Sequence, residues 1–484
     1  MAGGLVLRLA LSLTHGNMLG VDGGAYLLSV NDVLGDEPTS AGFPRPPLAP
    51  GWLLVPFVQF LGNDAGYKVW SSLAAIGPLL PVYLLSRRIL TPWQALLPVL
   101  FISVDMLHAE MFVTGALPLI GFTFIGLAVW AAIRLTEIEY FHWPLWLLLI
   151  LTAPLTSFIN QTSAGLYPIV VGVAILALMA QGRFRLVMWR VAPAIVLGTM
   201  LAVRALPWYL DVLPGSAILH YPGPWIYLTP WPDAVWFQFA LAMPLSYWLI
   251  RYGQGPVRLL GTLTAVLGVL LVFLSTDETV INLFYRSGYL LQVFLYPGLA
   301  WVVFTYWRPV LNQRVAWAAV AVVVSVASWE YVNSFYGQAE YSDMVTVETA
   351  EALEYLRDAA PGQGVVTNAF TLSLWVSGLN KVETPHVWTW EPPRAFTGKD
   401  AQVRCIIGWV DGCDNVGATR ALRVSYVLVD RRFPYYNDRA PGNWGAPPNQ
   451  WEVTASAPWL DLVYSEGTTR LWKISNETAQ SIRK

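Results

Sequence analysis

A short polar segment near the N-terminus carries the first side chain that could do chemistry. Asp22 lies in the glycine-rich run from Gly20 to Gly24, between apolar stretches of the chain. A carboxylate at a membrane surface can accept the proton of an attacking hydroxyl group, which is the work of a general base. The glycines allow a tight backbone turn and the close approach of a substrate. The alternative is a solvated aspartate that caps a following helix.

The run from Arg45 to Leu48 reads Arg-Pro-Pro-Leu and follows in the same predicted outer loop. A guanidinium group is permanently charged and has the geometry to bind a phosphate. The two prolines fix an extended turn that could close the loop over Asp22 and direct Arg45 towards such a phosphate. Prolines also punctuate ordinary loops, so this motif alone leaves both interpretations open.

A cluster of three residues and a single arginine lie on the same predicted side of the membrane. Asp105, His108 and Glu110 could together bind a divalent cation such as Mg²⁺ or Mn²⁺, or could form a polar loop between two short helices. Arg286 lies at the outer mouth of an apolar helix, where a cation needs a partner. Either the phosphate of a carrier lipid or a headgroup reached by snorkelling could supply it.

Composition places most of the chain in lipid. Of 484 residues, 55% are hydrophobic and only 12% are charged, whereas soluble domains carry about 25% charged residues. The 24 Trp and 22 Tyr are typical of a protein with many membrane–water interfaces. The net charge is −2, and the sequence has no basic run and no nucleotide-binding glycine loop. We therefore expect no nucleic-acid partner.

A succession of apolar runs predicts about eleven membrane-spanning helices. The segment from Ala2 to about His15 is counted as a short first helix, although it could also be the core of a signal peptide. The other runs are 68–88, 91–107, 112–134, 143–159, 163–181, 187–205, 233–251, 257–275, 285–306 and 314–332.

Charge then predicts the orientation of these helices. The arginines in alternate connections all fall on one side: Arg87, Arg88, Arg134, Arg183, Arg185, Arg190, Arg251, Arg258, Arg308 and Arg314. By the positive-inside rule this side is cytoplasmic. The loop 16–67 with Asp22, and everything after the last span, are therefore predicted to lie outside the cytoplasm.

The chain changes character near residue 333, where it becomes mixed and polar. We predict a transmembrane domain over 1–332 and a small extracytoplasmic α/β domain over 333–484, with helices at 347–359 and 371–379. Strands are predicted at 364–367, 424–430, 460–464 and 469–474, the last two as a hairpin. Cys405 and Cys413 are the only cysteines. Outside the cytoplasm, a disulfide is favoured over a metal or redox site.

The order of these features resembles the polytopic GT-C glycosyltransferases, in particular the group with the protein O-mannosyltransferases and the lipid A aminoarabinose transferases. The motifs that carry the resemblance cover about residues 15–90, from the Asp22 loop through Arg45 to Arg88. The remaining helices and the outer domain match in architecture. One departure is Gly23, where members often carry a second acidic residue.

The resemblance implies a transferase that moves a sugar from a polyprenyl-phosphate carrier to an extracytoplasmic protein, lipid or glycan, with inversion. Asp22 would be the catalytic base, and Arg286 with Arg45 would bind the donor phosphate, in a bacterial or archaeal cell membrane. One alternative is a non-catalytic subunit of a membrane assembly on the same scaffold. Another is a transporter or flippase for a lipid-linked sugar, which predicts charges near the bilayer midplane and repeated halves.

Overall fold

The protein is described by a computed structural model that covers most of the chain. The described residues are 2–15, 18–19, 23–35, 48–105, 117–159, 161–203, 231–275, 281–307, 313–359, 362–368, 370–380, 384–385, 399–410, 412–431 and 450–475. The chain forms two compact units. The first comprises Met1–Ser12, Val69–Tyr221 and Pro230–Glu340, and the second comprises Leu13–Lys68, Pro222–Thr229 and Tyr341–Lys484.

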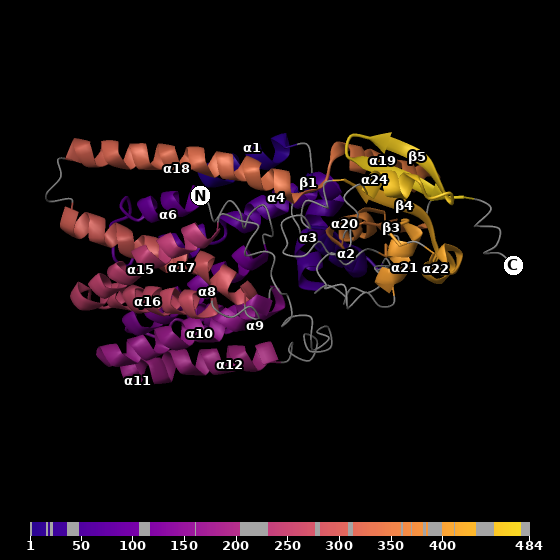
Figure 1. Ribbon diagram of the computed structural model, residues 1–484. Helices are drawn as coiled ribbons and strands as arrows, with labels where there is room; N and C mark the ends of the chain where they lie inside the picture. Colours follow the sequence, from indigo (N-terminus) through magenta and orange to yellow (C-terminus); the bar gives the residue numbers. More distant parts are fainter. Residues whose placement is uncertain are drawn as a thin grey trace. The chain divides into compact units, whose positions relative to one another are not determined.

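The first unit is a bundle of apolar helices (Figure 1). The helices that lie wholly or partly in this unit include α1 (Ala2–Thr14), α4 (Asn63–Ile76), α5 (Leu79–Ser86), α6 (Leu96–Ser103), α8 (Leu117–Glu137), α9 (Trp143–Ile159), α10 (Gln161–Leu178), α12 (Ala192–Val203), α15 (Trp231–Tyr252), α16 (Pro256–Ser275), α17 (Ile281–Val302) and α18 (Gln313–Ser342). Helix α9 packs between α8 and α12, and α16 packs between α15 and α17.

Every apolar run predicted from the sequence overlaps one of these helices. Within the described residues, four helical stretches are long and apolar enough to cross a membrane: Asn63–Ser86, Leu117–Glu137, Ser163–Val203 and Ser287–Tyr306. Five shorter apolar helices accompany them. The predicted helical membrane protein is therefore confirmed, while the number of eleven spans stays a prediction. Helix α18 continues ten residues past the predicted end of the last span at 332.

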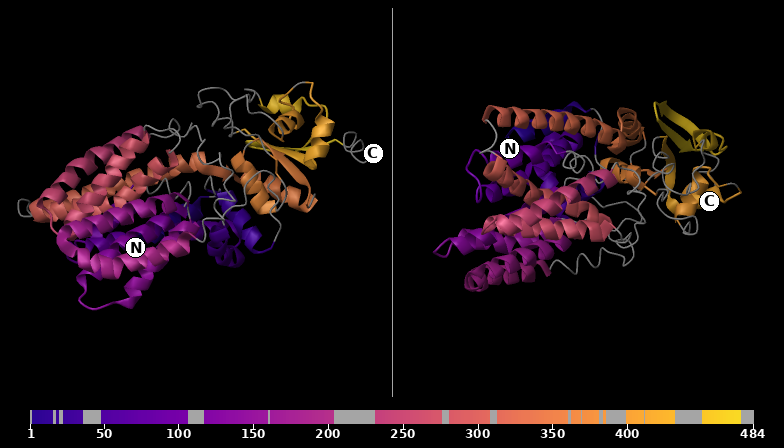
Figure 2. Two further views of the ribbon diagram at one scale, coloured as in Figure 1. Left: turned by 90° about the horizontal axis from the view of Figure 1, so that it is seen from below. Right: turned by 60° about the vertical axis from the view of Figure 1, so that its left-hand side comes forward.

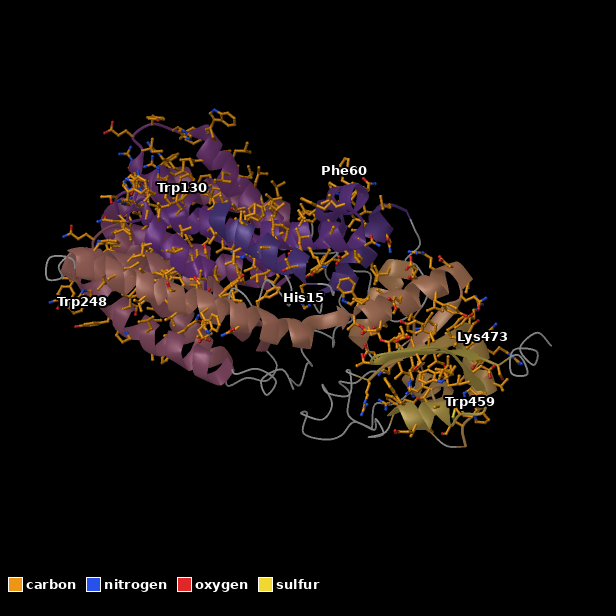
Figure 3. All side chains as sticks on the ribbon, turned by 90° about the horizontal axis from the view of Figure 1, so that it is seen from above. His15, Phe60, Trp130, Trp248, Trp459 and Lys473 are labelled. Carbon is orange, nitrogen blue, oxygen red and sulfur yellow. A yellow bond between two sulfur atoms is a disulfide. The ribbon has the colours of Figure 1, made fainter. Side chains whose placement is uncertain are left out.

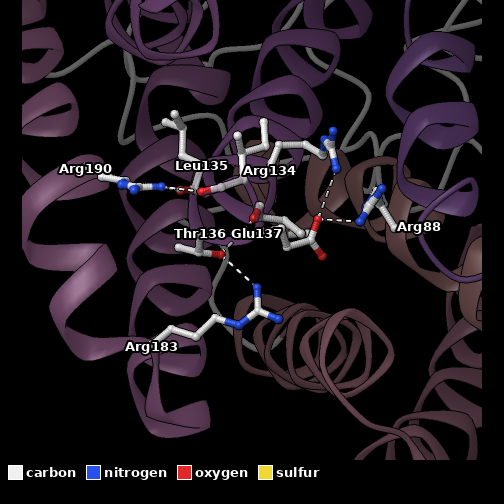
Figure 4. Close-up of polar contacts among 9 residues, drawn as sticks. Arg88, Arg134, Leu135, Thr136, Glu137, Arg183 and Arg190 are labelled. Carbon is white, nitrogen blue, oxygen red and sulfur yellow. Dashed lines mark hydrogen bonds and ion pairs between the residues drawn. The ribbon is translucent and has the colours of Figure 1, made fainter. Parts of the chain in front are cut away.

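Four of the predicted inner arginines converge on the C-terminal end of α8 (Figure 4). Arg88 and Arg134 both pair with the carboxylate of Glu137, at 2.5 and 3.5 Å. Arg183 donates to the hydroxyl of Thr136 at 2.9 Å, and Arg190 donates to backbone carbonyls that include Leu135, at 3.3 Å. The last carbonyls of a helix lack partners within it and carry partial negative charge, so arginines stabilise that end. These four residues lie at one end of the bundle. Its assignment to the cytoplasm stays a prediction.

The short first helix contains a cation that the bundle buries completely. The side chain of Arg8 donates to the carbonyl of Ser103 at 3.1 Å and to that of Gly4 at 3.0 Å. The guanidinium carbon also lies 5.4 Å from the centre of the Tyr331 ring. Ser103 is the last residue of α6, so Arg8 caps a helix end from a neighbouring helix. This accounts for an arginine in the middle of an apolar helix.

The second unit contains a four-stranded mixed sheet (Figure 2). Its strand order is β3-β4-β6-β5. The strands are β3 (Gly364–Thr367), β4 (Val424–Asp430), β5 (Leu460–Glu466) and β6 (Thr469–Ile474). Strand β3 pairs with β4 in parallel, and the other two pairings are antiparallel. The helices of this region are α19 (Val347–Ala359), α20 (Phe370–Asn380), α21 (Lys399–Ile406), α22 (Asn415–Leu422) and α24 (Gln450–Ala455). The small α/β arrangement predicted for this region is confirmed.

The sequence of each strand matches its place in the sheet. Central strand β4 is a run of mainly apolar residues and is buried along nearly its whole length. Edge strand β5 instead exposes most of its side chains, Asp461 and Leu462 among them. Trp459, labelled in Figure 3, donates from its indole nitrogen to the carbonyl of Ile406 at 2.9 Å, which fixes the end of α21 against the start of β5.

Cys405 and Cys413 form a disulfide bond, with their Cα atoms 5.9 Å apart. Cys405 is buried in a core cluster with Val403 and Ile407. The bond therefore ties the end of α21 to the segment that leads into α22, where Asp414 caps the helix by accepting from the backbone nitrogen of Gly417 at 2.8 Å.

Removing this disulfide should destabilise the second unit. For the double variant Cys405→Ala, Cys413→Ala we expect the free energy of unfolding to fall by about 2.5 kcal/mol, because a short cross-linked loop restricts the unfolded chain. Thermal unfolding of the detergent-solubilised protein measures the change. Wild-type protein treated with a reductant should behave like the double variant. Equal stability of all three samples would show that the bond contributes nothing.

Candidate functional site

The predicted site residues are only partly within the described structure. Asp22, Arg45, His108 and Glu110 lie outside the described residues. Arg286 falls on helix α17, and Asp105 is described in full. The geometry of the site is therefore built from the elements that flank these positions.

The elements on both sides of Asp22 are anchored within the second unit. Strand β1 (Met18–Leu19) pairs antiparallel with β2 (Asp343–Val345), so the chain before Asp22 is hydrogen-bonded to the segment after α18. Helix α2 (Gly23–Val33) begins directly after Asp22. Three residues, 20–22, therefore join two elements whose positions are fixed by contacts with distant parts of the chain.

Two aromatic side chains pack on the first residue of α2. A Cβ atom placed on Gly23 would lie 2.7 Å from Cη2 of Trp375, and closer still to Cζ2. It would also lie 3.0 Å from Cζ of Tyr67. The rings of Tyr67 and Trp375 meet edge to face, with centroids 5.7 Å apart and planes at 87°, a favoured arrangement of aromatic pairs. Position 23 has no room for a side chain.

Helix α2 is also held along its length. The amide of Asn31 donates to the carbonyl of Gly378 at 2.9 Å. A Cβ on Gly378 would lie 3.0 Å from the carbonyl oxygen of Gly24, so α20 lies close against the α2 backbone. Helix α3 (Leu48–Leu61) also packs against α2, and a Cβ on Gly51 would lie 2.5 Å from the carbonyl carbon of Ser29. Glycine is required at such contacts because only it leaves the backbones free to approach.

A lysine at the first position of the predicted span 68–88 contacts two residues of the second unit. Lys68 is buried, and its ammonium group pairs with Asp64 at 2.9 Å. It also donates to the carbonyl of His15, labelled in Figure 3, at 2.9 Å. These contacts fasten the start of α4 to the chain just after α1.

Asp105 binds helix α17. The amide of Gln292 donates to Oδ1 of Asp105 at 2.6 Å, and the hydroxyl of Tyr296 donates to Oδ2. Both donors lie on the same helix as Arg286 and face one side of it, because they are four residues apart. Asp105 therefore fixes the position of the helix that carries the predicted phosphate ligand. Among the described residues, no group of three His, Cys, Asp or Glu side chains could hold a metal ion.

Several residues of this region were not singled out in the sequence analysis. Trp375 and Tyr67 belong to different segments, and no local pattern brings them to Gly23. Gln292 and Tyr296 do leave a local signal, because two polar residues spaced by four share a face in the mainly apolar second half of α17.

Breaking the link between Asp105 and α17 should destabilise the first unit. In Asp105→Ala, the buried amide of Gln292 and the hydroxyl of Tyr296 lose their acceptor, which costs about 2 kcal/mol. Asp105→Asn should lose less, because its amide oxygen still accepts from Gln292. Unfolding temperatures of the two variants in detergent measure the difference. If Asp105→Ala unfolds at the wild-type temperature, the link does not hold α17.

The sequence matches no protein-family profile, and no curated protein matches it. Solved structures do match the fold. ArnT from Cupriavidus metallidurans, bound to undecaprenyl phosphate, has a TM-score of 0.60 at 12% identity, over 99% of this chain and 98% of that chain. The archaeal oligosaccharyltransferase AglB from Archaeoglobus fulgidus, in complex with an inhibitory peptide and a dolichol-phosphate, has a TM-score of 0.59 at 11% identity. That match covers 98% of this chain and 74% of AglB.

The arabinofuranosyltransferase AftD from Mycobacteria also matches, with a TM-score of 0.55 at 14% identity over 98% of this chain and 40% of AftD. All three matches extend over nearly the whole chain, so they include both units. The structural match confirms the resemblance seen in the sequence: this multi-pass membrane protein has, over its whole length, the fold of the GT-C membrane glycosyltransferases ArnT and AglB.

Proposed function

We propose that this chain is an inverting membrane glycosyltransferase that moves a sugar from a polyprenyl-phosphate carrier to an extracytoplasmic acceptor. The observation that carries the proposal is the whole-length match to transferases of this fold, two of which were solved with a polyprenyl-type phosphate. The anchored elements on both sides of Asp22 support it further, because a catalytic group must be held in a fixed geometry.

In the proposed reaction, Asp22 takes the proton of the acceptor hydroxyl as its oxygen attacks the anomeric carbon of the sugar. The new carbon–oxygen bond forms on one face while the bond to the carrier phosphate breaks on the other. The released polyprenyl phosphate keeps the electron pair of the broken bond, and the anomeric centre is inverted. Arg286, with Arg45, stabilises the negative charge that grows on the departing phosphate.

A divalent cation at Asp105, His108 and Glu110 stays a candidate, and the proposal includes no step that depends on it. Both carboxylate oxygens of Asp105 already accept hydrogen bonds from α17. A metal ligand can also accept hydrogen bonds, so these contacts fit either a metal-binding or a purely structural carboxylate. Mg²⁺ or Mn²⁺ would be the ions suited to this donor set.

Replacing the proposed base should abolish transfer. Purified full-length protein is incubated with a lipid extract of its native membranes, and release of polyprenyl phosphate is followed by mass spectrometry. We expect Asp22→Asn to slow release by about 100-fold or more, the usual contribution of a general base. Asp32→Asn, a matched change on α2, should stay near the wild-type rate. Wild-type release by Asp22→Asn would refute the mechanism. If the wild-type protein released nothing and carried a stoichiometric partner, the non-catalytic subunit would be favoured.

Replacing the proposed phosphate ligand should weaken carrier binding. We expect Arg286→Gln to retain about tenfold less polyprenyl phosphate through purification, because a charge-assisted contact to the phosphate is lost. Native mass spectrometry measures the bound lipid. Arg251→Gln, at a predicted inner position, is the control and should retain as much as the wild type. Equal retention by the two variants would remove Arg286 from the donor site.

A further inference from the structure

Trp375 is among the largest fully buried side chains of the protein, and it lies on the residue next to Asp22. It belongs to helix α20, more than three hundred residues away in sequence. Its Cζ2 and Cη2 atoms occupy the space that a side chain at position 23 would need. Packing within the second unit therefore requires glycine at position 23, and a carboxylate side chain there would displace the indole ring of Trp375.

Helix α20 contacts α2 near both ends of α2. At the start, Trp375 covers Gly23, and Tyr67 supports the indole edge to face. Near the other end, Asn31 donates to the carbonyl of Gly378. Two separated contacts to one rigid helix fix both the position and the direction of α2, which a single contact does not. The start of α2 is the end of the segment that carries Asp22.

We propose that Trp375 is a positioning residue for glycosyl transfer: its indole fixes the backbone at Gly23 and so acts on the adjacent proposed base, Asp22. This inference rests on the proposed function of Asp22. It makes α20 part of the catalytic centre without contact to the substrate. It also leaves Asp22 without a second carboxylate at the adjacent position 23, which has no room for a side chain.

A purely structural role for Trp375 makes a different prediction. Trp472 on β6 is equally large and also fully buried, but it lies in the core cluster of the sheet. If Trp375 only fills a core, Trp375→Leu and Trp472→Leu should lower activity in step with their loss of thermal stability. If Trp375 positions Asp22, only Trp375→Leu should lower kcat beyond that loss.

The experiment measures kcat and KM for the donor lipid with the full-length protein, alongside the unfolding temperature. We expect Trp375→Leu to lower kcat by about 10-fold to 100-fold with KM nearly unchanged, since small displacements of a catalytic group have effects of this size. Trp375→Phe, which keeps an aromatic ring against Tyr67, should recover part of the rate. Trp472→Leu should keep kcat within about twofold of the wild type, because its site lies apart from the start of α2 and distant sites act independently.

A second pair of variants tests the contact directly. Gly23→Ala should lower kcat strongly, because its methyl group meets the indole. Leucine lacks the Cζ2 and Cη2 atoms, so Gly23→Ala combined with Trp375→Leu should be faster than Gly23→Ala alone. Residues in contact show such coupling, whereas distant ones do not. Gly172→Ala is the control, because its Cβ would meet open space.

The outcomes separate this inference from the proposed function. If Asp22→Asn is inactive but the effects of Gly23→Ala and Trp375→Leu simply multiply, the positioning role is refuted and the proposed function stands. Equal losses of kcat in Trp375→Leu and Trp472→Leu would refute it too. If Asp22→Asn is fully active, the proposed function fails, and the positioning role fails with it.

Discussion

The packing of the second unit depends on close contacts that helices α3 and α20 make with helix α2. Side chains cannot separate α2 from α3 at Gly51, nor from α20 at Gly23 and Gly378, because a Cβ at any of these positions would meet an occupied space. Close helix contacts of this kind use small residues to bring backbones together, and they hold geometry more tightly than contacts between flexible side chains. The pairing of β1 with β2 then fixes the chain on the other side of Asp22.

The first unit meets a different constraint, which is the cost of polar groups in apolar surroundings. Three of its described charged side chains, one buried and two half-buried, show how a partner is supplied. Arg8 caps the end of α6, Arg190 binds the end of α8, and Asp105 accepts from two donors on α17. In each case a helix end or a buried polar side chain supplies the missing partner. These polar residues therefore fix the positions of neighbouring helices relative to one another. Apolar packing alone is not directional and would fix them less.

The sequence predicts the local elements well, because their signals are local. Helix 143–159 and helix 347–359 have the predicted bounds, and the strands at 364–367 and 424–430 do too. Apolar length, alternation and turn residues fix such elements wherever they lie in the fold. Helix α3 was not predicted, because Pro50, Gly51 and Pro56 interrupt its pattern. Proline is tolerated at the first turn, and in apolar helices neighbouring groups compensate for an internal proline.

The arrangement around the candidate site could not be predicted in the same way, because its contacts join distant segments. The hydrogen bond from Asn31 to Gly378 spans 347 residues, and the β1–β2 pairing spans a similar distance. Contacts of such separation form late, since the loop must close before they contribute any stability. Helix α2, which begins directly after Asp22, cannot reach its final packing until α20 has been synthesised and folded. The contacts of α2 are thus completed by a helix that lies more than three hundred residues after the proposed base.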